Sequence, residues 1–286
     1  MSEIPRLNGI IRAWEAGKPA YTAFAKLDRQ VAAEMSDAPY DGIVFEMEHN
    51  PYDVTALGDS LQYMLSRSGI LKAGSPAPPV TPLARIPANG VEMNQSFAKQ
   101  VLDRGVYGVI WPHINNVAQA YNAVAACRYG RPKNAPLYEP RGVRGDGPAN
   151  AARYWGLTQA QYYECADVWP LAPKGEILVM LMIESVAGIE NLDDILANVP
   201  GIGGVLIGEG DLSQELGYPR QYEHPVVLEA MSNVVAACKR HGVVVGHPHT
   251  TTSNLERLLE EGYQFLMSAP QRSYGVVGKA QELAGY

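Results

Sequence analysis

Eight short apolar or β-rich runs recur along the chain, with longer stretches of helical spacing between most of them. They cover residues 20–24, 43–47, 82–86, 109–111, 177–183, 205–207, 243–245 and 264–267. The longest, Ile-Leu-Val-Met-Leu-Met-Ile at 177–183, has no polar residue, as is typical of a strand buried on both faces of a parallel sheet. Strand and helix that alternate eight times predict an α/β fold, a (β/α)8 barrel, with a doubly wound sheet as the alternative.

Three of the intervening stretches carry clear helix signals. Residues 191–198 place apolar side chains at helical spacing, 225–241 begins with proline and is followed by glycine, and 255–261 is also followed by glycine. Proline at the start of a helix and glycine just past its end are the expected boundary residues. We therefore expect a helix in each stretch.

Two segments interrupt the alternation. Residues 68–79 are rich in proline and glycine and are predicted to form a loop before the third strand. Residues 130–176 separate the fourth and fifth strands by more than one helix requires, and their centre at 140–147 (PRGVRGDG) is predicted to be a mobile charged loop over the catalytic face. We expect residues 1–286 to form a single barrel domain with this excursion at about 129–176.

Composition excludes several classes of function. The net charge is −7 and no cluster of lysine and arginine forms a basic stripe, which argues against nucleic acid as a partner. Cys127, Cys165 and Cys238 are widely spaced and are expected to be reduced thiols. No apolar stretch reaches membrane-spanning length, and the first residues lack the apolar core of a signal peptide. We expect a soluble cytoplasmic protein.

Polar side chains with catalytic potential follow the ends of most predicted strands. They are Glu46, Glu48 and His49 after the second strand, Arg85 on the third, His113 after the fourth, Glu184 after the fifth, Asp211 after the sixth, and His247 and His249 after the seventh. Because a barrel of this kind holds its active site at the carboxyl ends of its strands, we expect these side chains to converge there.

Glu184 and Asp211 are the strongest candidates for metal ligands. They follow successive strands, and two carboxylates so placed form half of an oxygen-ligand site for a hard divalent cation. The alternative for Asp211 is that it caps the next helix, a role that Ser213 could also take. Glu184 is harder to explain in that way, because Ser185 beside it already offers capping chemistry, and a buried carboxylate needs a metal or an arginine as its partner.

The other candidates also have structural alternatives. His49 could hold a turn, and Arg85 could form an ion pair with Glu46 or Glu48. The remaining three histidines could be packing residues, and a zinc site from His49, His113 and His247 has only a weak signal because the spacing is wide. Lys26, just beyond the first strand, would be the nucleophile of a metal-free Schiff-base mechanism.

The stretch 208–213 (GEGDLS) has the features of an anion site. Its two glycines let the backbone approach a ligand closely. If a helix begins near Leu212, its free amides point at an anion bound there, such as a substrate carboxylate. Such a carboxylate would lie within reach of a metal held by Glu184 and Asp211.

Six segments in the same order carry a resemblance to a known family. They are 41–49 (DGIVFEMEH), 84–89 (ARIPAN), 102–112 (LDRGVYGVIWP), 140–145 (PRGVRG), 182–188 (MIESVAG) and 207–218 (IGEGDLSQELGY). Together they resemble the HpcH/HpaI class II aldolases, which are metal-dependent pyruvate aldolases, over about residues 8–262. The resemblance implies a TIM barrel of the phosphoenolpyruvate/pyruvate type.

The resemblance also implies roles for individual residues. It makes Glu184 and Asp211 the ligands of Mg²⁺, Mn²⁺ or Co²⁺, Arg85 the residue that faces the keto oxygen, and His49 the base, acting through water. The substrate-binding groups that it implies are Arg85, Glu46 and the backbone around Gly210, Asp211 and Leu212. The chain departs from the family pattern at Met182, where glutamine is common, at Glu46, where aspartate is usual, and at 267–270 (MSAP), where Gly-Thr/Ser-Asp is usual.

The implied reaction is reversible cleavage of a 4-hydroxy-2-oxo acid into pyruvate, or a related 2-oxo acid, and an aldehyde, through a metal-stabilised enolate. Decarboxylation of a 2-oxo diacid, a condensation on the same enolate, and a barrel that binds a 2-oxo acid without turnover are the alternatives. The implied partners are these small molecules and other copies of the chain, as a hexamer built from dimers that exchange their final helix. The last segment, 274–286, supports exchange because it has few apolar residues with which to cover its own barrel.

Overall fold

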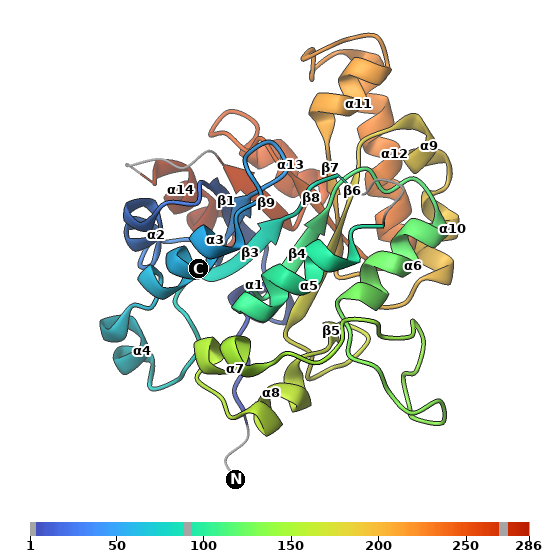
Figure 1. Ribbon diagram of the computed structural model, residues 1–286. Helices are drawn as coiled ribbons and strands as arrows, with labels where there is room; N and C mark the ends of the chain where they lie inside the picture. Colours follow the sequence, from blue (N-terminus) through green and yellow to red (C-terminus); the bar gives the residue numbers. More distant parts are fainter. Residues whose placement is uncertain (1–3, 89–92, 269–273, 286) are drawn as a thin grey trace.

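All eight apolar runs form parallel strands in the computed structural model, which describes residues 4–88, 93–268 and 274–285 (Figure 1). Neighbouring strands follow chain order, and the pairings of β1 with β9 and of β4 with β6 close the sheet. Closure confirms the barrel and excludes the doubly wound alternative. The barrel strands are β1 (Ala20–Ala25), β2 (Gly42–Glu46), β3 (Thr81–Arg85), β4 (Gly108–Trp111), β6 (Ile177–Ile183), β7 (Gly204–Ile207), β8 (Val244–His247) and β9 (Phe265–Ser268).

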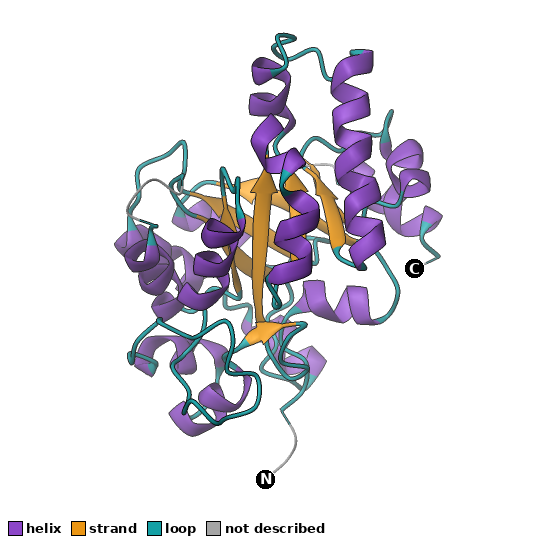
Figure 2. Cartoon of the chain, turned by 90° about the vertical axis from the view of Figure 1, so that its right-hand side faces the viewer, coloured by secondary structure: helices purple, strands orange, loops and turns teal. Residues whose placement is uncertain are grey.

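Helices surround the barrel, and two of the three predicted helices have the predicted bounds (Figure 2). In the third, Asn191 is the N-cap and the helix begins one residue later. None of the described helices is long and apolar enough to cross a bilayer. They are α1 (Gly9–Glu15), α2 (Arg29–Met35), α3 (Val54–Tyr63), α4 (Arg67–Ala73), α5 (Gln95–Arg104), α6 (Val117–Ala126), α7 (Ala149–Trp155), α8 (Gln159–Cys165), α9 (Val186–Glu190), α10 (Leu192–Asn198), α11 (Glu209–Glu215), α12 (Pro225–His241), α13 (Leu255–Glu261) and α14 (Gly275–Leu283).

Helix α1 closes the amino end of the barrel. The side chain of Asn8 caps it by accepting the amide of Ile10 at 3.0 Å, and the Asn8 amide donates to buried Glu176 at 2.8 Å. Ile10, Ile11 and Trp14 are buried among the side chains that fill the barrel interior. This end is therefore filled with apolar groups, which leaves the carboxyl ends of the strands for a ligand.

The excursion between the fourth and fifth barrel strands lies at the amino end, so the prediction that it covers the catalytic face is wrong. It contains α7, α8 and a two-residue strand, β5 (Val168–Trp169), which pairs with the first residues of β6. Figure 1 shows these elements beside the N-terminus, at the end opposite α11. The direction follows from α6, which returns the chain to the amino end before the excursion begins.

The centre of the excursion is a loop with Arg141 and Asp146 exposed, but its second arginine is not solvated. The Arg144 side chain is fully buried, donates to Asp103 at 3.0 Å and to the Tyr162 hydroxyl at 2.8 Å, and lies 4.6 Å from the centre of the Tyr129 ring. Its partners are far apart in sequence, so no local pattern indicates its burial. The loop predicted at 68–79 is only partly a loop. Its first six residues, 68–73, belong to helix α4, because Gly69 does not interrupt the helix.

Candidate active site

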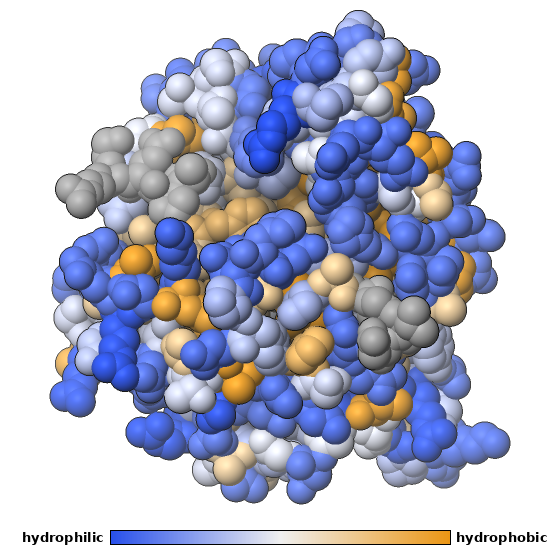
Figure 3. All heavy atoms as spheres, turned by 45° about the horizontal axis from the view of Figure 1, so that its top comes forward, coloured by the Kyte–Doolittle hydropathy of each residue, from blue (hydrophilic) through white to orange (hydrophobic). Residues whose placement is uncertain are grey.

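The strand ends meet at a cavity of about 490 Å³ at the carboxyl end of the barrel. Seen from this end, hydrophilic side chains border a hollow whose floor is apolar (Figure 3). A cavity of this volume is the usual size for a small-molecule site. Its lining residues are Phe24, His49, Arg85, Met182, Glu184, Gly208, Glu209, Gly210, Asp211, Gln214, Pro219, Arg220, Tyr222, Pro248 and His249.

The cavity contains most of the side chains selected from the sequence. Arg85, Glu184, Gly210, Asp211 and His49 all line it. The remaining predicted substrate-binding residues, Glu46 and Leu212, are buried beside it, as is the strand-end candidate His247. Glu48, another strand-end candidate, is half-buried, with 7% of its side chain exposed. Lys26 is exposed and is absent from the lining, so nothing in the geometry favours the Schiff-base alternative.

Arg85 is held by two carboxylates at the end of β3. In the sheet register it lies beside Glu46, with which its guanidinium forms an ion pair, and Nη1 lies 3.0 Å from Glu48. The guanidinium lies 4.7 Å from the centre of the Phe24 ring and contacts the Met182 sulfur at 3.6 Å. The predicted ion pair and the predicted position in the cavity are therefore both present, and Met182 occupies space next to the cation without supplying a strong acceptor.

Glu46 fixes the turn that follows β2. Its Oε1 accepts the amides of Glu48 at 2.7 Å and His49 at 3.1 Å, while its other oxygen faces Arg85. Both oxygens are therefore used within the protein. The His49 side chain is 68% exposed, and its Nε2 lies 3.7 Å from Glu48, so the turn is held by Glu46 and not by this histidine.

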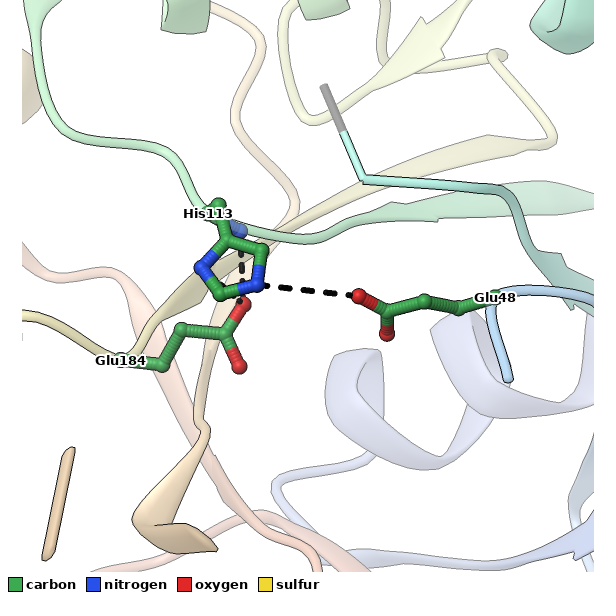
Figure 4. Close-up of side chains that lie close together, drawn as sticks. All are labelled: Glu48, His113 and Glu184. Carbon is green, nitrogen blue, oxygen red and sulfur yellow. Dashed lines mark hydrogen bonds and ion pairs between the residues drawn. The ribbon is translucent and has the colours of Figure 1, made fainter. Parts of the chain in front are cut away.

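Glu184 lies buried at the end of β6 and contacts His113. Its Oε1 accepts the His113 amide at 2.6 Å and lies 3.5 Å from the ring Nδ1, while the ring Nε2 lies 3.9 Å from Glu48 (Figure 4). His113 has a φ of +52°, which few non-glycine residues adopt, and this turns its amide toward the carboxylate. Burial raises the pKa of Glu184 to about 7, with the charges of Glu48 and Asp211 acting in the same direction and His113 opposing them.

Glu48, His113 and Glu184 could hold a metal ion. One ligand atom from each lies within 4.8 Å of the others. Burial also raises the pKa of Glu48, although the charge of Arg85, 3.0 Å from its Oε2, acts in the opposite direction. Two buried carboxylates that are costly to ionise without a cation, with a third carboxylate on the same cavity wall, fit a divalent ion that prefers oxygen ligands.

The sequence placed the metal on Glu184 and Asp211, and the structure brings both to one cavity. It adds Glu48 and His113, which were selected as strand-end residues; His113 was considered as a ligand only in the zinc alternative and Glu48 not at all. The sequence signal for Glu48 was its position two residues after Glu46. If the extended backbone continues past β2, the side chains of residues 46 and 48 point to the same side of the strand.

Helix α11 begins at the site without a side-chain cap, so Asp211 does not serve as one. Ser213 accepts the Arg220 amide at 3.1 Å and donates to the Gly210 carbonyl at 2.8 Å instead. The Leu212 amide donates to the Gly208 carbonyl at 3.1 Å. As in any helix, the amides before it have no acceptor within the helix, and these belong to residues 209–211.

The sequence did not single out Glu209, which is 2% exposed and pairs with two histidines. His247 Nε2 lies 3.1 Å from one carboxylate oxygen, and His249 Nδ1 hydrogen-bonds to the other. Burial alone would raise the pKa of Glu209, but the hydrogen bonds and charges of the two histidines lower it to about 2. The sequence carried one signal for this group, two histidines separated by one residue at the end of β8, and we had interpreted these histidines as packing residues.

Comparison with known proteins supports the resemblance. Residues 22–270 match the sequence model of the HpcH/HpaI aldolase/citrate lyase family. A 5-keto-4-deoxy-D-glucarate aldolase from Escherichia fergusonii is 30% identical over 80% of this chain and 77% of that protein. A 2-keto-3-deoxy-L-rhamnonate aldolase from Klebsiella pneumoniae is 32% identical over 79% and 73%, and a hydroxypyruvate/pyruvate aldolase from Agrobacterium fabrum is 31% identical over 81% and 77%.

Solved structures show the same fold. An HpcH/HpaI aldolase/citrate lyase family protein from Burkholderia cenocepacia superimposes with a TM-score of 0.74 at 25% identity, covering 96% of each chain. Macrophomate synthase superimposes with a TM-score of 0.65 at 20% identity, covering 99% of this chain and 89% of that one. At that identity the second likeness concerns the fold alone.

Proposed function

Because the chain belongs to the HpcH/HpaI aldolase/citrate lyase family, we propose that it is a divalent-metal-dependent aldolase that reversibly cleaves a 4-hydroxy-2-oxo acid into a 2-oxo acid and an aldehyde. Pyruvate, or a close relative of it, is the proposed 2-oxo acid. The names of three relatives, all aldolases, support the reaction type. The observation that carries the proposal is the meeting of Arg85, Glu184 and Asp211 at one cavity at the carboxyl end of the barrel.

Glu184 and Asp211 are the proposed ligands of Mg²⁺, Mn²⁺ or Co²⁺, and Glu48 and His113 lie close enough to Glu184 to take part. A bound divalent ion would supply Lewis-acid stabilisation of the enolate that forms when the carbon–carbon bond breaks. The raised pKa of Glu184 supports this assignment, because a cation is the partner that the ionised form of a buried carboxylate requires.

Arg85 is the proposed partner of the keto oxygen. Its guanidinium is positioned in advance by Glu46 and Glu48, so it does not have to reorganise as negative charge develops on that oxygen. The proposed site for the substrate carboxylate is the free amide groups at Gly210 and Asp211. A Cβ at Gly210 would meet no atom within 4 Å, so the backbone there is open to a ligand.

His49 is the proposed acceptor of the proton of the hydroxyl that becomes the aldehyde. It lines the cavity, and neutral imidazole is a suitable base near pH 7. These roles concern the 2-oxo acid half of the substrate and do not identify the aldehyde. The substrate screen therefore has to include 4-hydroxy-2-oxo acids that release polar aldehydes of different charge.

The test is release of pyruvate from a panel of 4-hydroxy-2-oxo acids, with Mg²⁺ or Mn²⁺ and with a chelator. We expect release with metal and its loss on chelation. Release of CO₂ from oxaloacetate without aldol cleavage would favour a decarboxylase, and binding of pyruvate without any turnover would favour a binding barrel. Activity that survives chelation and is trapped by borohydride would overturn the metal-dependent mechanism.

Substitution of the proposed ligands gives the first testable prediction. Glu184→Gln and Asp211→Asn should each lower the metal-dependent rate by at least about 100-fold, since even residues that only support a ligand contribute factors of this order. Glu190→Gln and Asp194→Asn, on exposed positions of α9 and α10, are matched controls that should keep full activity. Thermal unfolding of all four variants checks the fold, and full activity in the metal-stripped double variant of Glu184 and Asp211 would contradict the assignment.

A further inference from the structure

A second group of titratable side chains lies on the cavity wall, outside the cluster of Glu48, His113 and Glu184. Glu209, at the start of α11, and His249, after β8, both line the cavity. The His249 ring hydrogen-bonds through Nδ1 to the Glu209 carboxylate and stacks on Tyr222 with ring centres 5.5 Å apart and planes 11° apart. The His249 ring is therefore held from two sides, although 56% of the side chain remains exposed.

The neighbouring histidine explains how the Glu209 carboxylate stays in place. His247 accepts the amide of His249 at its Nδ1 (3.2 Å), so its proton is on Nε2, which lies 3.1 Å from Glu209. One carboxylate oxygen faces His247 and the other faces His249. Glu209 therefore contacts His249 at Nδ1, and among the described residues no hydrogen bond or ion pair reaches the other ring nitrogen, Nε2.

His49, the other histidine in the cavity, is not held in this way. Both oxygens of Glu46 are used by backbone amides and by Arg85, and the Glu48 carboxylate lies 3.7 Å from the His49 ring. A buried carboxylate that orients an imidazole is the arrangement that acid–base catalysis by histidine commonly uses. In this cavity that arrangement belongs to His249.

We propose that His249, positioned by Glu209, is a second acid–base residue of the active site and transfers the proton at C3 of the 2-oxo acid. The assignment rests on the proposed aldolase function. Glu209 and His249 line the same cavity as Gly210 and Asp211, where the substrate carboxylate is proposed to bind, so we place the ring at the end of the substrate that carries this carboxylate. C3 of a 2-oxo acid is two bonds from that carboxylate.

The proton transfer is balanced in both directions. In enolisation, Nε2 of His249 takes a proton from C3, the C–H electron pair forms the C2–C3 double bond, and the carbonyl electron pair moves onto the keto oxygen, which Arg85 faces. After aldol cleavage the enolate C3 takes a proton from the imidazolium form of His249, which gains its proton from solvent, and the C2–C3 double-bond electron pair forms the new C–H bond as the carbonyl re-forms. The hydroxyl proton moves separately, at His49.

The groups that contact His249 come from three elements. The ring contacts Glu209 on α11 and Tyr222 on the segment after α11, and the backbone amide contacts His247 on β8. Asp211 and Arg220 line the same cavity, so charges of both signs lie around it.

The experiment measures exchange of the pyruvate methyl protons for deuterium by NMR, in the metal-loaded protein, beside aldol cleavage. His249→Gln should lower exchange by about 100-fold, the lower end of the range for an acid–base residue. Glu209→Gln should lower it less, by about 10-fold, because Glu209 only orients the ring. His49→Ala should lower cleavage more than exchange. His241→Asn, a histidine that pairs with Asp193 away from the cavity, is the control and should change neither rate.

Added imidazole separates catalysis from support of the fold. His249→Ala should regain part of its exchange rate with imidazole, because the exposed ring position is open to solvent, and His241→Ala should not respond. A His249→Gln variant that folds and exchanges at the wild-type rate overturns this inference alone, as does a lost rate that imidazole does not restore in His249→Ala. A wild-type protein that neither exchanges nor cleaves overturns the proposed function together with it.

Discussion

Arg85 has two tasks at the residue scale, because it neutralises Glu46 and Glu48 and also faces the cavity. We expect Arg85→Ala to lower kcat by about 100- to 1,000-fold, as loss of one group that stabilises a developing oxyanion does. It should also lower the free energy of unfolding, since two buried carboxylates lose their counter-charge. Arg85→Lys keeps the positive charge but loses the bidentate guanidinium, so its kcat and its stability should lie between those of the wild type and Arg85→Ala.

Steady-state kinetics and thermal unfolding of both variants separate the two tasks. An Arg85→Ala protein with lower thermal stability and an unchanged kcat would mean that the arginine is only an ion-pair partner.

The raised pKa of Glu184 predicts how the stability of the metal-free protein depends on pH. Its pKa is about 7 in the folded protein against 4.5 for an unperturbed glutamate, so its contribution to stability is fully present below pH 4.5 and is lost as the pH rises through about 7. A shift of this size corresponds to about 3 kcal/mol. Glu184→Gln has no charge to bury, and we expect it to unfold at the wild-type temperature near pH 4.5 and at a higher temperature at pH 8.

The measurement is the melting temperature of both proteins in chelator across this pH range. Added Mg²⁺ or Mn²⁺ should raise the wild-type value at pH 8 and leave the variant unchanged. A pH-independent difference between the two proteins would show that the buried carboxylate has another counter-charge.

The residues that sequence reasoning found and those it missed differ in one physical respect. Arg85 and Glu184 stand directly at strand ends and Asp211 lies in the first turn of the helix that follows β7, so the fold itself brings them to one end of the barrel. Glu209 and His249 depend on a contact across 40 residues, and only the packed structure brings them together. The metal cluster is an intermediate case, since Glu48 was named as a strand-end residue but its contact with His113 could not be derived from spacing.

At the scale of elements, the start of α11 packs directly against the Glu184 side chain, and the residue in contact is Gly208. Gly208 accepts no side chain because a Cβ would lie 2.2 Å from the Glu184 Oε2 and 2.5 Å from its Cβ. Gly208→Ala should therefore displace the carboxylate and weaken metal binding and activity, with a loss of about 1–3 kcal/mol in the free energy of unfolding. Gly278→Ala in α14, where a Cβ meets nothing within 4 Å, is the matched control.

Titration of metal by calorimetry and thermal unfolding test this prediction. If Gly208→Ala binds metal as tightly as the wild type, the close approach of α11 to Glu184 is not needed to place the ligand.

Elements with a strong local pattern were predictable, and those held by distant contacts were not. The barrel strands and helices α12 and α13 carry apolar runs, a proline start or a glycine end. Helices α7 and α8 also have boundary signals, Gly156 after α7 and the Thr158–Gln161 capping box at the start of α8, but seven residues are too few to show a helical apolar period. Distant contacts such as the stacking of Trp155 on Tyr107 at 4.2 Å hold them in place. Helix α6 returns the chain from the carboxyl end of β4 to the amino end of the barrel. The sequence analysis did not predict this helix, and it therefore assigned the excursion to the wrong end.

At the scale of the whole molecule, the final helix has a defined place on the barrel. Val276, Val277 and Ala280 of α14 are buried, and the Tyr21 hydroxyl of β1 donates to the Ala280 carbonyl at 3.1 Å. The apolar side chains of this helix are few, but they are the ones that pack. The connection at 269–273, which includes part of the atypical ending of the eighth barrel strand at 267–270, lies outside the described residues, as does Asn89 of the arginine segment.

The last prediction is that the protein is a homo-oligomer whose subunits exchange α14, with a hexamer built from dimers as the expected form. An exchanged helix would make the same contacts to Tyr21 on the neighbouring barrel, so exchange costs little beyond association and favours a symmetric dimer. Light scattering over about three decades of protein concentration should show a mass well above one 31.1 kDa chain, with activity following the oligomer. A strictly monomeric protein with full activity would contradict both the assembly and the contribution of a neighbouring subunit to the site.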